Sequence, residues 1–152
     1  MAEVNVTRTR LSKIAGTKAP ASSFNRVRKA VVTMAAAYAA PAQNDIAGTE
    51  LVLVAGSRLV GGVYVSNGAG TASSTLSVGL RDAITKVAVD ATAIVNAVAI
   101  TTAASAQVDT GTKLITGQDY ILPSDMEIYF TFGGAAGAAN QQIRVEVPFV
   151  AP

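Results

Sequence analysis

The sequence predicts an all-β fold: an antiparallel β-sandwich with jelly-roll-like or Greek-key topology and an extended N-terminal arm. Short stretches in which apolar and polar residues alternate are separated by turns rich in Gly, Asn and Pro, which is typical of antiparallel sheets. Ala supplies 29 of the 152 residues and aromatic residues only 5%, so we expect a thin core of aliphatic side chains. Residues 1–25 have no apolar face, which predicts an arm outside a sandwich formed by residues 26–152.

The arm and the sandwich differ in charge. Residues 1–44 contain seven basic residues against Glu3 alone, whereas residues 45–152 contain five basic and nine acidic residues. This asymmetry indicates a charged partner for the arm, the alternative being a tail that only aids solubility. A short strand is expected over residues 4–10. The candidate partner-binding residues are Arg8, Arg10, Lys13, Lys18, Arg26, Arg28 and Lys29.

Residues 26–38 are compatible with three structures. Their basic cluster, their apolar run and the sequence Ala37-Tyr38-Ala39 resemble the end of an export signal, but the lead is 29 residues long and the apolar run lacks Leu and Ile. A helical stripe is also present, formed by Val27, Val31, Met34 and Tyr38. The β-branched valines, the stop at Pro41 and the β-rich sequence downstream favour a strand, which we expect.

Three short strands follow, joined by turns. Residues 50–54 lead into a turn at 55–57, residues 58–65 come next, and the step Asn67-Gly68 marks the turn before residues 73–79. In the strand over 58–65, one face carries Leu59, Gly61, Val63 and Val65. In the strand over 73–79, one face carries Ser74, Leu76 and Val78. Residues 82–108 are more ambiguous, because Ala favours a helix while Ile, Val and Thr favour strands. We expect strands over 82–90 and 93–101 with at most one helical turn.

The C-terminal third is again β. Its expected elements are strands over 119–122, 126–132 and 142–150, separated by a turn at 123–125 and a Gly-rich loop at 133–140. In the middle strand Met126, Ile128, Phe130 and Phe132 alternate with Glu127, Tyr129 and Thr131. Pro148 has no N–H for a β-ladder, which predicts that the last strand lies at a sheet edge or ends there.

The sequence lacks the residues on which most enzymes and metal sites depend. It contains neither Cys nor His, which removes thiolate and imidazole ligands and the usual general base. The Gly-rich stretches lack the ending of a phosphate-binding loop, and no serine nucleophile elbow occurs. Asp125 and Glu127 are close enough to share a cation, but a solvated rim is the simpler interpretation. We expect no catalysis, no cofactor, no metal ion and, because every long uncharged window contains polar residues, no membrane span.

Two stretches of the chain resemble small virion proteins of tailed bacteriophages. The first is GTELVLVAGSRLVGGVYVSNGAGTASSTLSVGLRD, in which Gly56–Gly62 and Ser74–Asp82 carry the pattern of strands and turns. The second is the ending EIYFTFGGAAGAANQQIRVEVPFV. The resemblance covers roughly residues 26–82 and 119–150. It implies a capsid decoration (cement) protein or a closely related head structural protein.

Under this resemblance the protein sits on the capsid exterior, bridges subunits of the major capsid protein and associates with itself as a trimer, after assembly in the host cytoplasm. The basic arm would then pair with carboxylates of the capsid. Each exposed pair contributes about 0–1 kcal/mol, and many copies add through multivalency. Two alternatives remain: another virion component, such as a head fibre base or a neck or tail protein, and a nucleic-acid-binding module. The second is the weaker one, because Phe24 is the sole aromatic residue of the arm available for base stacking.

The arm hypothesis predicts that removing residues 1–25 leaves the sandwich folded and weakens its attachment to capsids. Co-sedimentation of the truncated and full chains with capsids measures the difference. Full occupancy by the truncated chain would refute the role of the arm.

Overall fold

The computed structural model describes residues 26–115 and 120–152. The described residues form nine strands and no helix, which confirms the all-β prediction. The arm, with the predicted strand over 4–10 and the candidate residues Arg8, Arg10, Lys13 and Lys18, lies outside the described residues. No helix among the described residues has the length and apolar character needed to cross a membrane.

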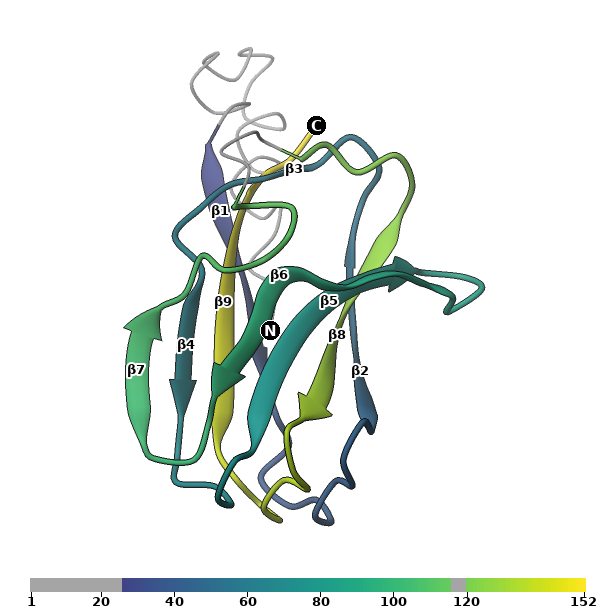
Figure 1. Cartoon of the computed structure of the whole chain (residues 1–152). Helices are drawn as coiled ribbons and strands as arrows, with labels where there is room; N and C mark the ends of the chain where they lie inside the picture. The colour runs from purple at the N-terminus through teal and green to yellow at the C-terminus, as the bar shows by residue number, and fades with distance from the viewer. Residues whose placement is uncertain (1–25, 116–119) are drawn as a thin grey trace.

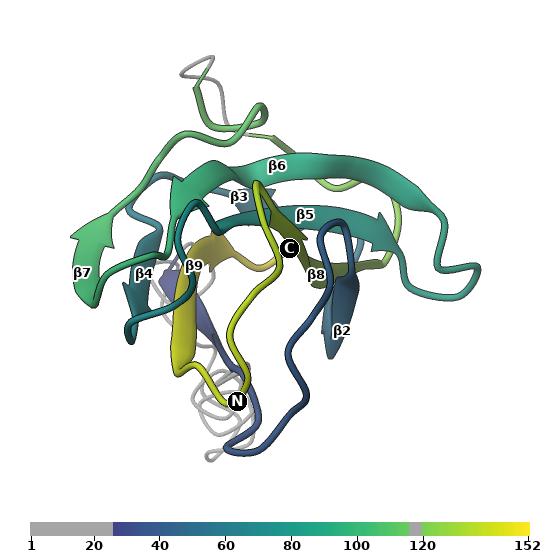
Figure 2. The same ribbon diagram turned by 60° about the horizontal axis from the view of Figure 1, so that its bottom comes forward.

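The strands form two sheets packed face to face, and every strand pair is antiparallel (Figures 1 and 2). Sheet A contains β1 (Val27–Thr33), β3 (Arg58–Leu59), β4 (Tyr64–Asn67), β7 (Ala104–Gln107) and β9 (Ile143–Val150). Sheet B contains β2 (Ile46–Leu53), β5 (Thr75–Asp82), β6 (Ala88–Ala99) and β8 (Met126–Gly133). The strand orders are β1-β9-β4-β7, with β3 also paired to β9, and β2-β8-β5-β6. The predicted antiparallel β-sandwich is confirmed.

The chain crosses from one sheet to the other at every connection except two. The exceptions are the step from β3 to β4, which both lie along β9, and the β5–β6 hairpin within sheet B. Strands that are far apart in the sequence therefore lie side by side, and Val27 of β1 is opposite Val150 of β9. Apart from the β5–β6 hairpin, the fold is held by pairing between strands that are far apart in the sequence.

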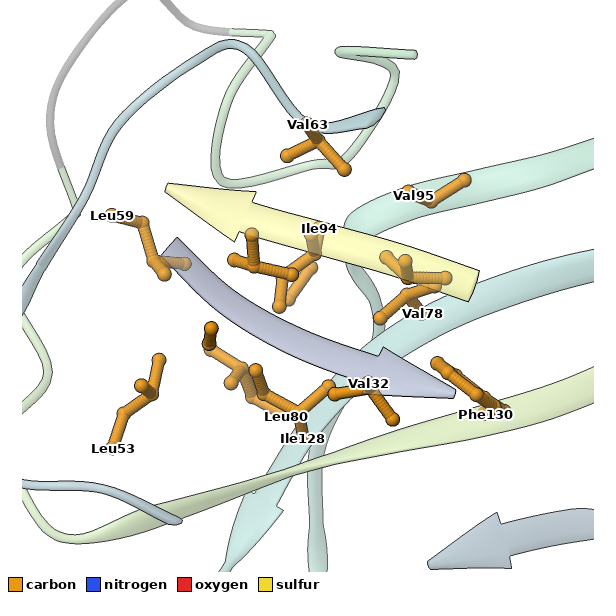
Figure 3. Packing of buried hydrophobic residues seen from close by; sticks show 14 of the residues in the cluster. Val32, Leu53, Leu59, Val63, Val78, Leu80, Ile94, Val95, Ile128 and Phe130 are labelled. Atoms are coloured by element: carbon orange, nitrogen blue, oxygen red, sulfur yellow. The ribbon is translucent and has the colours of Figure 1, made fainter. Parts of the chain in front are cut away.

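The core lies between the sheets and is built from the faces that the alternation predicted (Figure 3). Phe130, Phe132 and Phe149 are its largest side chains, and aliphatic residues fill the space around them. The residues on the predicted strand faces that are at most 2% exposed are Leu59, Val63, Val65, Ser74, Leu76, Val78, Met126, Ile128, Phe130 and Phe132. In the last strand, Ile143, Val145 and Val147 are buried to the same degree. The period of two thus located the core-facing side of the predicted strands over 58–65, 73–79 and 126–132.

Residues 26–38 form a strand in their first half only. β1 pairs with β9 along its whole length and buries Ala30 and Val32 against the core. Beyond Thr33 the chain leaves the sheet, and the hydroxyl of Tyr38 donates to the carbonyl of Gln141 at 2.6 Å. The helical alternative is excluded here because pairing with β9 requires an extended backbone.

The prediction that Pro148 marks a sheet edge is wrong, because β9 lies between β1 and the β3–β4 pair. The predicted strand over 58–65 is broken: Leu59 is opposite Phe149, Tyr64 is opposite Glu146, and the residues between them bulge. The N–H of Val60 donates to the Pro148 carbonyl at 3.3 Å, so the main-chain polar groups of Pro148 face this break. The missing N–H of proline therefore interrupts no regular ladder.

The strands predicted over 82–90 and 93–101 are also corrected. β5 ends at Asp82, residues 83–87 form a tight turn, and β6 runs unbroken through both predicted segments. The Asp82 carboxylate accepts the N–H groups of Ile84 and Thr85 at 2.9 and 2.7 Å, which fixes the turn despite its β-branched residues. Register shifts interrupt the ladder between β5 and β6 and that between β2 and β8. β7 was not predicted, because its four exposed residues show no alternation.

The turn after β8 predicts a strong preference for glycine at position 134. Gly134 has φ = 69°, and a Cβ there would collide with the carbonyl oxygen of Ser73. We expect Gly134→Ala to lower the free energy of unfolding by about 1–3 kcal/mol from backbone strain alone, with the collision adding to it. Gly133→Ala is the matched control, since its Cβ would meet only the movable hydroxyl of Thr75 at 3.0 Å. Urea unfolding measures both variants, and equal losses would contradict this explanation.

Candidate partner-binding surfaces

The structure does not gather the described basic candidates into one patch. Arg26 is exposed and precedes β1, whereas Arg28 and Lys29 are consecutive residues of that strand. Successive side chains of a strand point to opposite faces. Arg28 is therefore half-buried on the face that carries Ala30, and Lys29 is exposed on the outer face of sheet A.

On the outer face of sheet A, two cations share one carboxylate. The Nζ atom of Lys29 and the Nη2 atom of Arg144 each lie 2.7 Å from an oxygen of Glu146. The hydrogen bond from Lys29 holds the pKa of Glu146 below its usual value. Both cationic side chains are more than half exposed, so each ion pair adds little stability. The group carries one net positive charge into the solvent.

A hollow of about 640 Å³ lies on the same face of sheet A. Four of its lining residues, Thr33, Arg144, Ser66 and Ser105, are opposite one another across β1, β9, β4 and β7. The remaining lining includes the small residues Ala35, Ala36, Gly68 and Ala103 and the apolar Met34 and Ile143. We call this feature the sheet A hollow. Its small side chains leave room for a protruding group of a partner.

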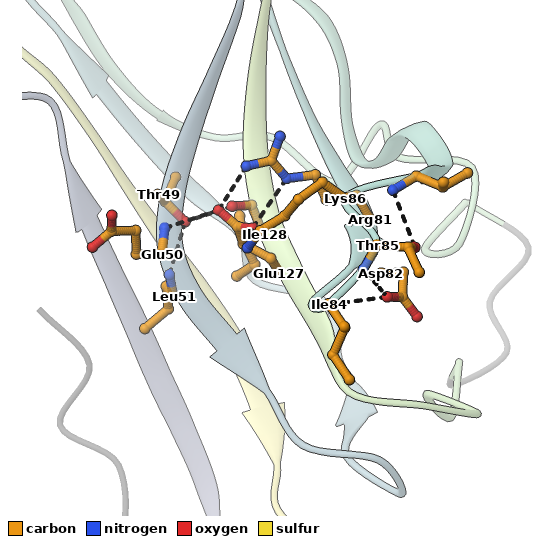
Figure 4. Close-up of polar contacts among 11 residues, drawn as sticks. Thr49, Glu50, Leu51, Arg81, Asp82, Ile84, Thr85, Lys86, Glu127 and Ile128 are labelled. Carbon is orange, nitrogen blue, oxygen red and sulfur yellow. Dashed lines mark hydrogen bonds and ion pairs between the residues drawn. The ribbon is translucent and has the colours of Figure 1, made fainter.

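Glu127 was expected on a solvated rim, and this interpretation is wrong. Its side chain is buried on the outer face of sheet B, where the guanidinium of Arg81 donates to both carboxylate oxygens at 2.9 and 3.0 Å (Figure 4). The ammonium of Lys86 lies 2.6 Å from the same group, and the N–H of Glu50 donates to it at 3.0 Å. Gly48 makes room for this arrangement, because a Cβ there would collide with the Arg81 guanidinium.

These contacts determine the charge state of Glu127. Burial by itself would raise the pKa of this carboxyl group, but the hydrogen bonds from Arg81, Lys86 and the Glu50 N–H outweigh it and lower the pKa to about 2. Arg81 also lies over the ring of Tyr129, 5.5 Å from its centroid. Glu127 thus joins β2, β5 and β8 to the turn that carries Lys86.

The Glu127 group supports a protruding apolar tip. The β5–β6 hairpin extends beyond β8 and β2 (Figures 1 and 2), and its turn and the start of β6 expose Ile84, Val87 and Val89 at 90%, 65% and 49%. We call these three residues the hairpin tip. The side chain of Ile84 points away from the sandwich (Figure 4). Sequence reasoning missed this surface because the same β-branched residues were read as part of a strand over 82–90 rather than as an exposed turn.

Acid titration tests the Glu127 group. Because the folded-state pKa lies below the ordinary value of 4.5, this group stabilises the fold above pH 4.5, and the contribution is lost as the pH falls towards about 2. The shift corresponds to about 3 kcal/mol. We expect Glu127→Gln to lower the free energy of unfolding at pH 7 by a similar amount and to flatten its dependence on pH between 4.5 and 2.

The matched control is Glu50→Gln, which removes an exposed carboxylate from the neighbouring strand. Chemical unfolding of the unaltered chain and both variants at several pH values provides the measurement. A Glu127→Gln variant as stable as the control would show that the buried ion pairs do not stabilise the fold.

Comparison with known proteins supports the fold. No family model and no curated protein matches the chain. Among solved structures, the chain is similar to one described as "Cyanophage Pam1 capsid asymmetric unit", with 18% sequence identity and a TM-score of 0.53. The similarity covers 91% of this chain and 95% of that chain. At this identity, it is the β-sandwich that the two chains share.

Proposed function

We propose that the protein is a non-enzymatic structural component of a tailed-phage virion, which decorates the capsid exterior and stabilises it by bridging subunits of the major capsid protein. The observation that carries the proposal is the similarity to a chain from a cyanophage capsid asymmetric unit. Because it spans nearly the whole of both chains, the matched chain has about the same length as this one. The whole sandwich, rather than a part of it, therefore supports the proposal.

The connectivity of the sandwich supports the same proposal. When β3 and β4 are counted as one interrupted strand, each sheet has four strands, and the chain alternates between the sheets except at the β5–β6 hairpin. Eight strands connected in this way form a jelly roll, a fold that viral capsid domains use. The fold hosts other functions as well, so it supports the proposal only together with the capsid match.

In this proposal the sandwich supplies the rigid body and the basic segment supplies attachment. Residues 1–25 are rich in basic residues, and the exposed Arg26 and Lys29 continue this positive charge at the start of sheet A. Acidic groups of a shell subunit would bind there. Single ion pairs of this kind are weak, but a trimer binds through three copies at once, which raises its overall affinity for the shell. Binding that occurs only on the assembled shell stabilises that shell by mass action.

The copy number and the position of the protein in purified particles test the proposal. We expect a copy number that is a fixed ratio to the major capsid protein, measured by quantitative mass spectrometry, and density on the outer shell surface in cryo-electron microscopy. A few copies at one vertex or on the tail would indicate a fibre, neck or tail component instead. Absence from particles, together with strongly salt-dependent binding to plain DNA, would indicate the nucleic-acid-binding alternative.

A further inference from the structure

We propose that the hairpin tip of one copy seats in the sheet A hollow of a second copy. This inference rests on the self-association that forms part of the proposed function. It adds which two surfaces are in contact and that the contact is head-to-tail.

The first step is the chemistry of the hairpin tip. Turns normally carry polar residues and glycine, yet this one and the strand that follows expose Ile84, Val87 and Val89 within a few residues of one another. Single exposed apolar residues are ordinary, whereas a contiguous group on a protruding element marks a contact surface. The tip therefore has the composition of an anchor for a partner.

The second step is the rigidity of the hairpin tip. Asp82 accepts hydrogen bonds from the N–H groups of Ile84 and Thr85, and the N–H of Lys86 donates to the Asp82 carbonyl at 3.1 Å. The side chain of Lys86 is tied to the buried Glu127. A tip already held in one conformation loses little conformational entropy on docking. The buried ion pairs thus prepare the exposed apolar residues for contact.

The third step is complementarity between the two surfaces. The sheet A hollow is lined mainly by small side chains, together with the apolar Met34 and the polar Asn67 and Gln142, and at about 640 Å³ it is large enough for branched aliphatic side chains. The outer face around it has a net positive charge, since Lys29 and Arg144 share Glu146. The hairpin end of sheet B has a net negative charge, since it contains Asp82, Asp90, Asp125 and Glu127 against Arg81 and Lys86.

The fourth step identifies the occupant as a second copy. The hairpin belongs to sheet B and projects away from the sandwich (Figures 1 and 2), whereas the hollow lies on the outer face of sheet A. The two surfaces of one molecule therefore cannot meet each other. A contact between different surfaces of identical subunits is head-to-tail, and it closes into a ring when the rotation between neighbours allows. A trimer is one such ring.

The test compares three variants of the full chain by sedimentation equilibrium. Ile84→Asp places a charge on the tip, and Ala36→Trp fills the hollow, so we expect each to weaken self-association at least about 10-fold. Ile46→Asp is the matched control, because Ile46 is 58% exposed and pairs with Thr131 at the other end of sheet B. The control should associate like the unaltered chain. Circular dichroism verifies that all three variants fold.

Mixing the two defective variants makes the test specific. Ile84→Asp retains an intact hollow and Ala36→Trp an intact tip, so an equimolar mixture should form dimers and nothing larger. A monomeric unaltered chain, an Ile84→Asp variant that associates normally, or a mixture that stays monomeric would each overturn the proposal. The self-association assay contains no capsid, so its result does not depend on the proposed function. A chain that self-associates as described but is missing from purified particles would overturn the proposed function and leave this inference standing.

Discussion

The central position of β9 is the constraint on which sheet A depends. β9 pairs with β1 on one side and with both β3 and β4 on the other, so three strands from the first half of the chain have their ladders on one strand that follows all the others. The break between β3 and β4 is what lets that strand contain Pro148. Pairing at such sequence separations makes folding slow compared with that of helical bundles of similar size, because loop closure precedes most of the stabilising contacts.

Sheet B depends on a different device, a polar group buried on its outer face. Glu127 connects three strands and one turn through charged hydrogen bonds. These contacts lower the pKa of its carboxyl group to about 2, so the group stays ionised at any pH well above that value. A carboxylate in that position stabilises little compared with an apolar side chain of equal size, but removal of one partner leaves a buried charge. Its distinctive effect is geometric, because it links the rigid sheet to a turn that faces solvent.

The sequence predicted the parts of the fold that local patterns determine. The strands over 126–132 and 142–150 were predicted from such patterns, and both are present. The errors arose where a distant partner decides. Pro148 was misplaced because its missing N–H faces a break in another strand, and Glu127 because Arg81 lies 46 residues away with no local signal. The turn after Asp82 was read as a strand because its β-branched residues favour strands, whereas the Asp82 carboxylate that accepts the Ile84 N–H stabilises a turn. Of the basic candidates, only Arg26, Arg28 and Lys29 have described positions, and they do not form a cluster.

The edges of the two sheets have a consequence for the protein at high local concentration. β7 has only four residues, and the register shifts in the β2–β8 and β5–β6 ladders distort β2 and β6, with Glu50 at a positive φ of 58°. Short or bulged borders are poor templates for strand addition by a neighbouring chain. At β2, β6 and β7, side-chain surfaces rather than backbone ladders therefore determine how neighbouring copies meet.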